Sequence, residues 1–216
     1  MSGPSAIGIL GVGASLPTEV RTNDWWKPEV VARWMEGRAR QLAALRDAPE
    51  PSSEGGARVH RAILELGGDP FQGSRERRIM PPGATSYDLE EAAARDALDR
   101  AGVQPREIDL VLTHTVVPEY QVQNAACILH QRLGLPARCF TMQADATAFS
   151  FLAQLRIAQQ LIATGQAQKA LLVQSCGATR ILDVEHPFAP LFGDGATATV
   201  AGEVEANRGI LAADIR

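Results

Sequence analysis

The residues best suited to do chemistry lie in one segment, 139–150, which reads Cys-Phe-Thr-Met-Gln-Ala-Asp-Ala-Thr-Ala-Phe-Ser. This pattern predicts a short strand, a sharp turn and the start of a long helix. A side chain in such a turn points into the positive end of the helix, where a cysteine nucleophile of low pKa is expected. The turn holds Asp145, Thr147 and, one turn into the helix, Ser150, but no cysteine. A hydroxyl group ionises far less readily than a thiol, so Thr147 or Ser150 needs an adjacent general base to act as a nucleophile.

Asp145 and Thr147 are also common N-cap residues, which contribute typically about 1 kcal/mol to a helix. A capping role and a nucleophilic role therefore both remain open for this turn. His114 is a further candidate, because it lies at the carboxyl end of a predicted strand, where open α/β sheets bind their ligands. A histidine at that place is equally compatible with an ordinary core position.

No metal site is expected. The four histidines lie far apart in the sequence without helical i,i+4 partners, and the three cysteines (Cys127, Cys139 and Cys176) form no CxxC pair. An odd, widely spaced set of cysteines also argues against a disulfide framework and suits a reducing cytoplasm.

The elements around the turn alternate regularly. Helices are predicted over 85–100, 123–133 and 147–164, and strands over 6–13, 108–115, 138–142, 169–175 and within 192–202. This alternation is typical of an α/β fold, with a mostly parallel mixed sheet and helices on both of its faces.

The composition excludes several classes of partner. There are 21 Lys and Arg against 25 Asp and Glu, a formal net charge of -4, which argues against a nucleic acid or an anionic membrane surface as the main partner. No apolar run approaches the roughly 20 residues needed to span a bilayer. Two glycine motifs are weak nucleotide signals: Gly11-Val12-Gly13 is followed by Pro17 rather than by a helix, and Gly193-Asp194-Gly195 lacks the Lys-Ser/Thr of a P-loop. The second motif is better explained as a tight turn.

Four motifs in order carry a resemblance to a known family. They are GVGASLPTEVRTND (11–24), GSRERR (73–78), QNAACILHQRLG (123–134) and FGDGA (192–196). With them the chain resembles the β-ketoacyl-acyl-carrier-protein synthase III family of the thiolase superfamily. The resemblance implies a single thiolase-like N-terminal domain over 1–216, with an inserted helical and loop segment at about 25–72.

The activity that the resemblance implies is acyl transfer or decarboxylative condensation. An acyl group would move from coenzyme A or an acyl carrier protein to an enzyme cysteine and then to an acceptor, with no tightly bound cofactor. The position of that cysteine falls on Thr147 when counted forward from Gly134, or on Ala148 when counted back along the next helix. Thr147 is therefore the first candidate for the catalytic residue, with Asp145 and Ser150 as alternatives.

The same resemblance locates the residues that hold coenzyme A. The tryptophan and arginine of the family's clamp fall on Gly67 and Phe71 here. Trp25, Trp26 or Trp34 would stand in for the clamp if the extra segment folds over the entrance.

Members of the family consist of two similar halves, and the catalytic histidine and asparagine belong to the second. The sequence ends at Arg216, just after the first half. We therefore expect a second chain to supply the other half, in polyketide or other specialised metabolism, with obligate association covering the apolar surface between them. A fragment of a longer product is the other explanation.

A non-catalytic role is the alternative hypothesis. The chain would then scaffold an active ketosynthase homologue or dock its carrier protein. Arg75, Arg77 and Arg78 would meet an acidic carrier protein, while a structural role inside the fold is the competing interpretation for these arginines.

Overall fold

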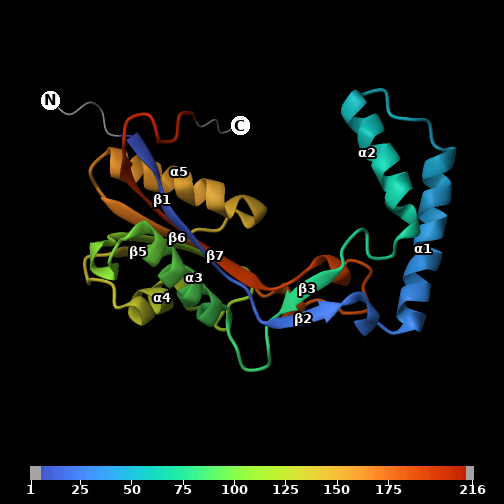
Figure 1. Cartoon of the computed structure of the whole chain (residues 1–216), viewed down its shortest axis with the longest axis horizontal. Helices are drawn as coiled ribbons and strands as arrows, with labels where there is room; N and C mark the ends of the chain where they lie inside the picture. Colours follow the sequence, from blue (N-terminus) through green and yellow to red (C-terminus); the bar gives the residue numbers. More distant parts are fainter. Residues whose placement is uncertain (1–5, 213–216) are drawn as a thin grey trace. The chain divides into compact units, whose positions relative to one another are not determined.

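The structure is a computed structural model that describes residues 6–212, and these residues form two compact units. The second unit consists of Thr18–Ile79 and Thr179–Gly193, and the first unit contains the rest of the described chain (Figure 1).

The first unit is built on a five-stranded sheet. In sheet order the strands are β1 (Ala6–Ser15), β7 (Gly195–Val204), β6 (Lys169–Cys176), β4 (Leu110–Thr115) and β5 (Phe140–Gln143). β4 pairs in parallel with both β5 and β6, and β7 pairs antiparallel with β6 and β1. Four strands therefore run in one direction and β7 runs in the other, which confirms the mixed, mostly parallel sheet predicted from the sequence.

Helices cover both faces of this sheet, as predicted (Figure 1). They are α3 (Ser86–Ala101) and α4 (Ala125–Leu133) on one face and α5 (Ser150–Ala163) on the other, with the short 3-10 helices η3 (Pro105–Glu107) and η4 (Thr147–Phe149) in the connections. Parallel strands need such crossover helices because their ends lie at opposite edges of the sheet.

The ends of α3 follow the signals in the sequence. The Thr85 hydroxyl accepts a hydrogen bond from the Asp88 N–H, and the Asp88 carboxylate accepts one from the Thr85 N–H, which together form a capping box. Gly102 ends the helix with φ of +63°, a conformation that glycine adopts without steric cost.

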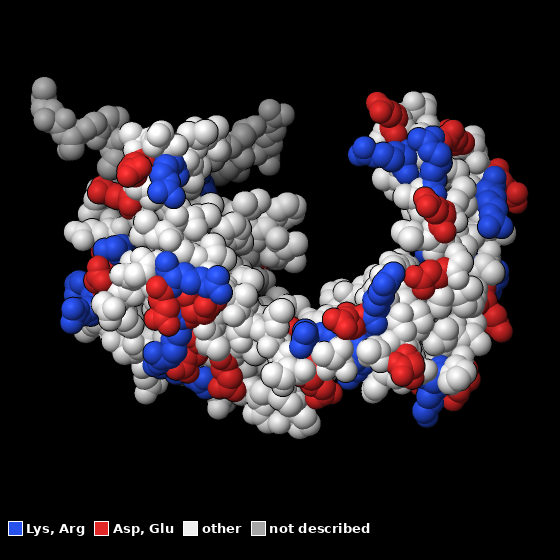
Figure 2. Space-filling view, viewed as in Figure 1, with Lys and Arg blue, Asp and Glu red and all other residues white. Residues whose placement is uncertain are grey.

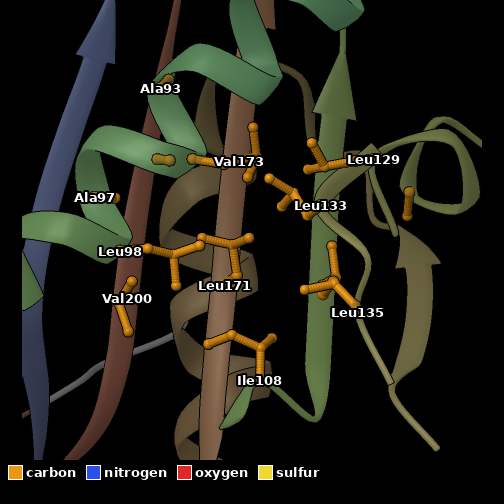
Figure 3. Packing of buried hydrophobic residues seen from close by; sticks show 14 of the residues in the cluster. Ala93, Ala97, Leu98, Ile108, Leu129, Leu133, Leu135, Leu171, Val173 and Val200 are labelled. Atoms are coloured by element: carbon orange, nitrogen blue, oxygen red, sulfur yellow. The ribbon is translucent and has the colours of Figure 1, made fainter. Parts of the chain in front are cut away.

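Each face of the sheet carries its own apolar core. On the α3 and α4 face, Leu98 packs toward Leu171 and Ile108, and all three are almost completely buried (Figure 3). On the α5 face, Leu110, Leu112 and Leu172 meet the buried side of the helix. Val111 and Leu112 therefore point to opposite faces, as successive residues of a strand do. Continuous apolar strands are expected where both faces are covered.

The glycines of β1 serve packing. A Cβ atom added at Gly13 would lie 2.3 Å from the backbone nitrogen of Ala97, and one at Gly11 would lie 2.7 Å from that of Ala101. Helix α3 therefore lies directly against β1 because neither glycine has a side chain. This contact explains the Gly-Val-Gly motif without a nucleotide.

The Gly-Asp-Gly motif forms the turn into β7. Asp194 is buried, and its carboxylate accepts a hydrogen bond of 2.7 Å from the Met80 N–H. The turn therefore connects β7 to the segment that leads into α3.

The second unit contains a two-stranded antiparallel ribbon and two helices. Its elements are β2 (Glu19–Thr22), η1 (Asn23–Trp25), α1 (Pro28–Asp47), α2 (Glu54–Glu65), η2 (Leu66–Gly68), β3 (Glu76–Ile79) and η6 (Ala189–Leu191), with η5 (Ala178–Arg180) at its border. Trp26 and Trp34 form its core with Val30 and Ala189. The two indole N–H groups donate to the carbonyl oxygens of Val184 and Glu185 at 2.8 and 2.6 Å, so the rings are fixed as well as buried.

The extra segment expected at about 25–72 falls wholly within the second unit. That it is an insertion into a single thiolase-like domain stays a prediction. On the visible face of each unit, acidic and basic side chains are interspersed rather than gathered into a patch of one sign (Figure 2).

Replacing Gly13 by alanine is expected to lower the free energy of unfolding by about 1–3 kcal/mol, since the new Cβ would overlap the backbone of α3, which cannot rotate away. Thermal and denaturant unfolding of the full chain would measure the loss. Gly37→Ala is the matched control, because a Cβ at Gly37 meets no atom within 4 Å and removes a helix-interior glycine. A Gly13→Ala variant as stable as the wild type would contradict this account of the motif.

Candidate functional site

The turn between β5 and α5 is held at the carboxyl edge of the sheet. Its first residue, Ala144, donates its N–H to the Thr113 carbonyl on β4 at 2.9 Å and accepts a hydrogen bond of 3.0 Å from the Gln154 side chain of α5. Gln154 is completely buried and accepts in turn from Gln174 of β6 at 2.6 Å. The predicted strand, sharp turn and helix are therefore confirmed, and the turn is tied to three elements.

Ser150 has a structural role in this turn. Its side chain is buried, and its Oγ accepts from the Ala146 N–H at 2.9 Å and donates to the Thr147 carbonyl at 2.7 Å. A hydroxyl that is shut away and uses its hydrogen in this way is poorly placed to attack a substrate. The expectation that Ser150 is an alternative nucleophile is corrected accordingly.

Thr147 occupies the strained position of the turn. Its φ is +54°, in the left-handed region that a β-branched residue seldom enters. Such a conformation costs on the order of 1–3 kcal/mol and persists only where the surrounding structure imposes it. The residue is exposed, and within residues 6–212 its hydroxyl group makes no hydrogen bond. The Thr147 side chain is therefore presented to solvent at the start of the helix.

Asp145 joins the turn to a histidine. Its Oδ1 accepts the Thr147 N–H at 2.6 Å and lies 3.2 Å from Nδ1 of His114. The Asp145 side chain is exposed, whereas His114 is only 9% exposed, and its Nδ1 is buried without a well-aligned hydrogen bond in the described chain. Sequence reasoning singled out His114 and Asp145 separately and missed their contact.

Glu90 is a second buried group at this edge, on the opposite face of the sheet, and the sequence gave no signal for it. It extends from α3, has no exposed surface, and accepts hydrogen bonds from Thr115 and Ser175 at 2.5 and 2.6 Å. Its Oε2 has no hydrogen-bond partner in the described part of the chain. Burial disfavours the ionised form and raises the pKa of Glu90 to about 7.

The cysteines lie outside the turn. Cys139 precedes β5 and is buried, and this burial raises the pKa of its thiol to about 11. Cys176 ends β6, and Cys127 is exposed on α4. None is placed to replace the missing nucleophile. Among residues 6–212, no group of three or more His, Cys, Asp or Glu is arranged to hold a metal ion.

The arginine motif is only partly available to a partner. Arg77 is buried in the second unit, donates to Pro190, Asn23 and Ser74, and stacks over Trp26 at 4.7 Å. Its guanidinium group stabilises the unit from inside, which corrects the expectation that Arg77 contacts a carrier protein. Arg75 and Arg78 are exposed.

The positions expected to clamp coenzyme A are occupied by packing. A Cβ at Gly67 would lie 2.5 Å from the Leu42 side chain, and Phe71 packs against Trp26 and Trp34. Trp26 and Trp34 are themselves buried, so neither is available to stack on a ligand. Trp25 is 49% exposed, with the Arg21 guanidinium 3.8 Å above its ring.

Comparison with known proteins identifies the family. The model of the N-terminal domain of thiolase matches residues 79–178, and that of 3-oxoacyl-[acyl-carrier-protein] synthase III matches residues 142–216. Two curated relatives are β-ketoacyl-[acyl-carrier-protein] synthases III. The one from Caldanaerobacter subterraneus is 35% identical over 64% of this chain, and the one from Alkalilimnicola ehrlichii is 38% identical over 62%. In each case the alignment spans 42% of the relative's own length, so the chain spans less than half of the curated relatives it matches.

Solved structures agree. The priming β-ketosynthase of the R1128 polyketide pathway matches with a TM-score of 0.69 and 26% identity, covering 95% of this chain and 52% of the other. The 3-oxoacyl-(acyl carrier protein) synthase III of Pseudomonas aeruginosa PAO1 matches with a TM-score of 0.66 and 28% identity, covering 93% and 53%. The chain is a β-ketoacyl-acyl-carrier-protein synthase III-like protein of the thiolase superfamily, with a thiolase-like α/β fold. No helix among the described residues is long and apolar enough to cross a membrane.

Glu90 should make stability depend on pH. Because its pKa is higher in the folded chain than the ordinary value of 4.5, the folded state holds its proton up to about pH 7 while the unfolded chain has released it. The free energy of unfolding should therefore fall between about pH 4.5 and pH 7, by at most about 1.4 kcal/mol for each pH unit.

Glu90→Gln keeps an acceptor oxygen for Thr115 and Ser175 but cannot ionise. Denaturant unfolding at several pH values should show the variant gaining on the wild type as the pH rises through this interval. Glu91→Gln, on the same helix and paired with Arg95 at the surface, is the control and should change stability by less than about 0.5 kcal/mol. Parallel pH profiles for wild type and Glu90→Gln would contradict the assignment.

Proposed function

We propose that the chain is part of a condensing enzyme or acyltransferase that acts on acyl thioesters of coenzyme A or of an acyl carrier protein, in polyketide or other specialised metabolism. The observation that carries the proposal is the strained Thr147 at the start of α5, the position to which the family's acyl-accepting cysteine corresponds. The names of the relatives support the reaction class, and the polyketide pathway named for one structural neighbour supports the setting.

Thr147 is the proposed acyl acceptor. Its oxygen would attack the thioester carbonyl carbon, forming an ester bond while the carbon–sulfur bond breaks and the thiol leaves. The N-terminal end of α5 would stabilise the negative oxygen of the intermediate, an effect worth typically 0.3–1 kcal/mol. Asp145 is engaged with the Thr147 N–H and lies beside His114, so we assign it a positioning role rather than the nucleophilic one.

We further propose that a second chain supplies a C-terminal thiolase-type half. Two large apolar side chains near the start of α5 support a covering partner, since Phe149 is 70% exposed and Leu152 is 60% exposed. Exposed apolar side chains gathered at one place commonly mark an interface. Arg75 and Arg78 are exposed and remain our candidates for contact with an acidic carrier protein.

A non-catalytic role as scaffold or carrier-docking partner is the second candidate. The observation that favours it is the residue types in the turn, where Thr147 and Ala148 stand at the two positions that could hold the family's cysteine.

Acyl transfer to Thr147 separates the two candidates. Intact-mass measurement of the full chain after incubation with a series of acyl-coenzyme A thioesters should show the mass of one acyl group, and peptide mapping should place it on Thr147. Thr147→Ala should lose the adduct, and Thr179→Ala, a threonine outside the first unit, should retain it. Absence of any adduct, with a carrier protein bound stoichiometrically, would decide for the scaffold.

The apolar surface of α5 is tested separately. Phe149→Ser together with Leu152→Ser should reduce self-association of the isolated chain, because both changes remove exposed apolar area that a partner would cover. Light scattering at increasing concentration measures the effect. Ile181→Ser, at a residue 68% exposed in the second unit, is the control. A wild-type chain that stays monomeric at high concentration would contradict the need for a partner.

A further inference from the structure

We propose that His114 is the general base of this site and that Asp145 positions it, so that the proton of the Thr147 hydroxyl passes to a residue of the same chain. The inference rests on the proposed role of Thr147 as acyl acceptor. It departs from the sequence expectation that the base belongs to a second half.

The sheet register brings His114 to the turn. Leu110 and Leu112 belong to the apolar cluster on the α5 face, so His114, two residues further along β4, points to the same face. The parallel pairing of Thr113 with Gln143 places the end of β4 beside the end of β5, and Asp145 follows two residues later. The contact of 3.2 Å between His114 Nδ1 and Asp145 Oδ1 follows from this arrangement.

The surroundings give His114 no other purpose. It is nine-tenths buried, and its Nδ1 has no aligned hydrogen bond in residues 6–212, although buried polar atoms are normally satisfied. Its strand neighbour on β6 is Gln174, and the buried side chain from α5 is Gln154, both uncharged amides that bond to each other. Asp145 is the group that can compensate a positive charge on the imidazole ring.

One carboxylate atom connects the two reacting residues. Asp145 Oδ1 approaches His114 Nδ1 and also accepts the Thr147 N–H. With Nδ1 directed to the carboxylate, Nε2 is the basic nitrogen, as in a Ser-His-Asp triad. The carboxylate thereby fixes both the orientation of the ring and the backbone conformation that presents the Thr147 hydroxyl.

The magnitudes show why a base is required. Stabilisation by a helix N-terminus at a surface site is worth less than about tenfold in rate, whereas a positioned general base contributes typically 10²–10⁴-fold. In the proposed step the Thr147 proton moves to His114 as the oxygen–carbon bond forms. The bond from the carbonyl carbon to the leaving group then breaks, and the imidazolium returns the proton to the leaving group.

The test uses p-nitrophenyl acetate as an activated acyl donor, so that it does not depend on the natural substrate. The full chain should acetylate at Thr147, and His114→Gln should slow this acetylation by about 10²–10⁴-fold. Added imidazole should restore part of the rate in His114→Gly, a recovery that a purely structural role would not produce. His186→Gln, at an exposed histidine of the second unit, is the control.

Asp145→Asn keeps an acceptor oxygen for the Thr147 N–H and removes the charge, so it should slow acetylation with unfolding unchanged. Asp145→Glu should recover part of the rate. Equal acetylation in wild type and His114→Gln, or no acetylation of Thr147 in the wild type, would overturn the proposal. Acetylation by p-nitrophenyl acetate without any transfer from acyl-coenzyme A or acyl carrier protein would instead reject the proposed function and leave the role of His114 intact.

Discussion

The site depends on the hydrogen bonds that fix Ala144. Its N–H continues the parallel pairing of β5 with β4, and its carbonyl oxygen accepts from Gln154 of α5, which is bonded in turn to Gln174 of β6. The backbone therefore cannot leave the sheet gradually, and it must reverse into the helix within a few residues. The left-handed conformation of Thr147 is the consequence of that constraint, and the bonds of Asp145 and Ser150 maintain it.

The two faces of the sheet end in different chemistry. On the α5 face the buried polar groups are Gln154 and His114, beside the turn, whereas on the α3 face Glu90 joins the ends of β4 and β6 through Thr115 and Ser175. A carboxyl group that stays protonated in this place can donate as well as accept, so it keeps the strand ends together at little electrostatic cost. The edge that presents the turn is thus held by polar groups from both sides.

The sequence predicted those features that are set by neighbouring residues. The limits of α3 follow from Thr85 and Gly102, and the turn before α5 follows from the change of pattern after Met142. Contacts between distant segments were out of reach. Arg77 is buried because Asn23 and Pro190 surround its guanidinium group, and nothing in an arginine-rich hexapeptide indicates this. The contact of His114 with Asp145 likewise required the register of β4 against β5.

A change from thiol to hydroxyl alters what a site must provide. A thiol with a pKa near 8.5 is brought into use by a shift of about one unit, which the field of a helix end can supply. A hydroxyl group needs a proton acceptor within reach, whatever the field around it. A buried histidine beside a carboxylate, on the strand next to the turn, is the arrangement that this need calls for. The strained backbone at Thr147 and the contact of His114 with Asp145 are therefore two parts of one physical solution, in which the same carboxylate holds both.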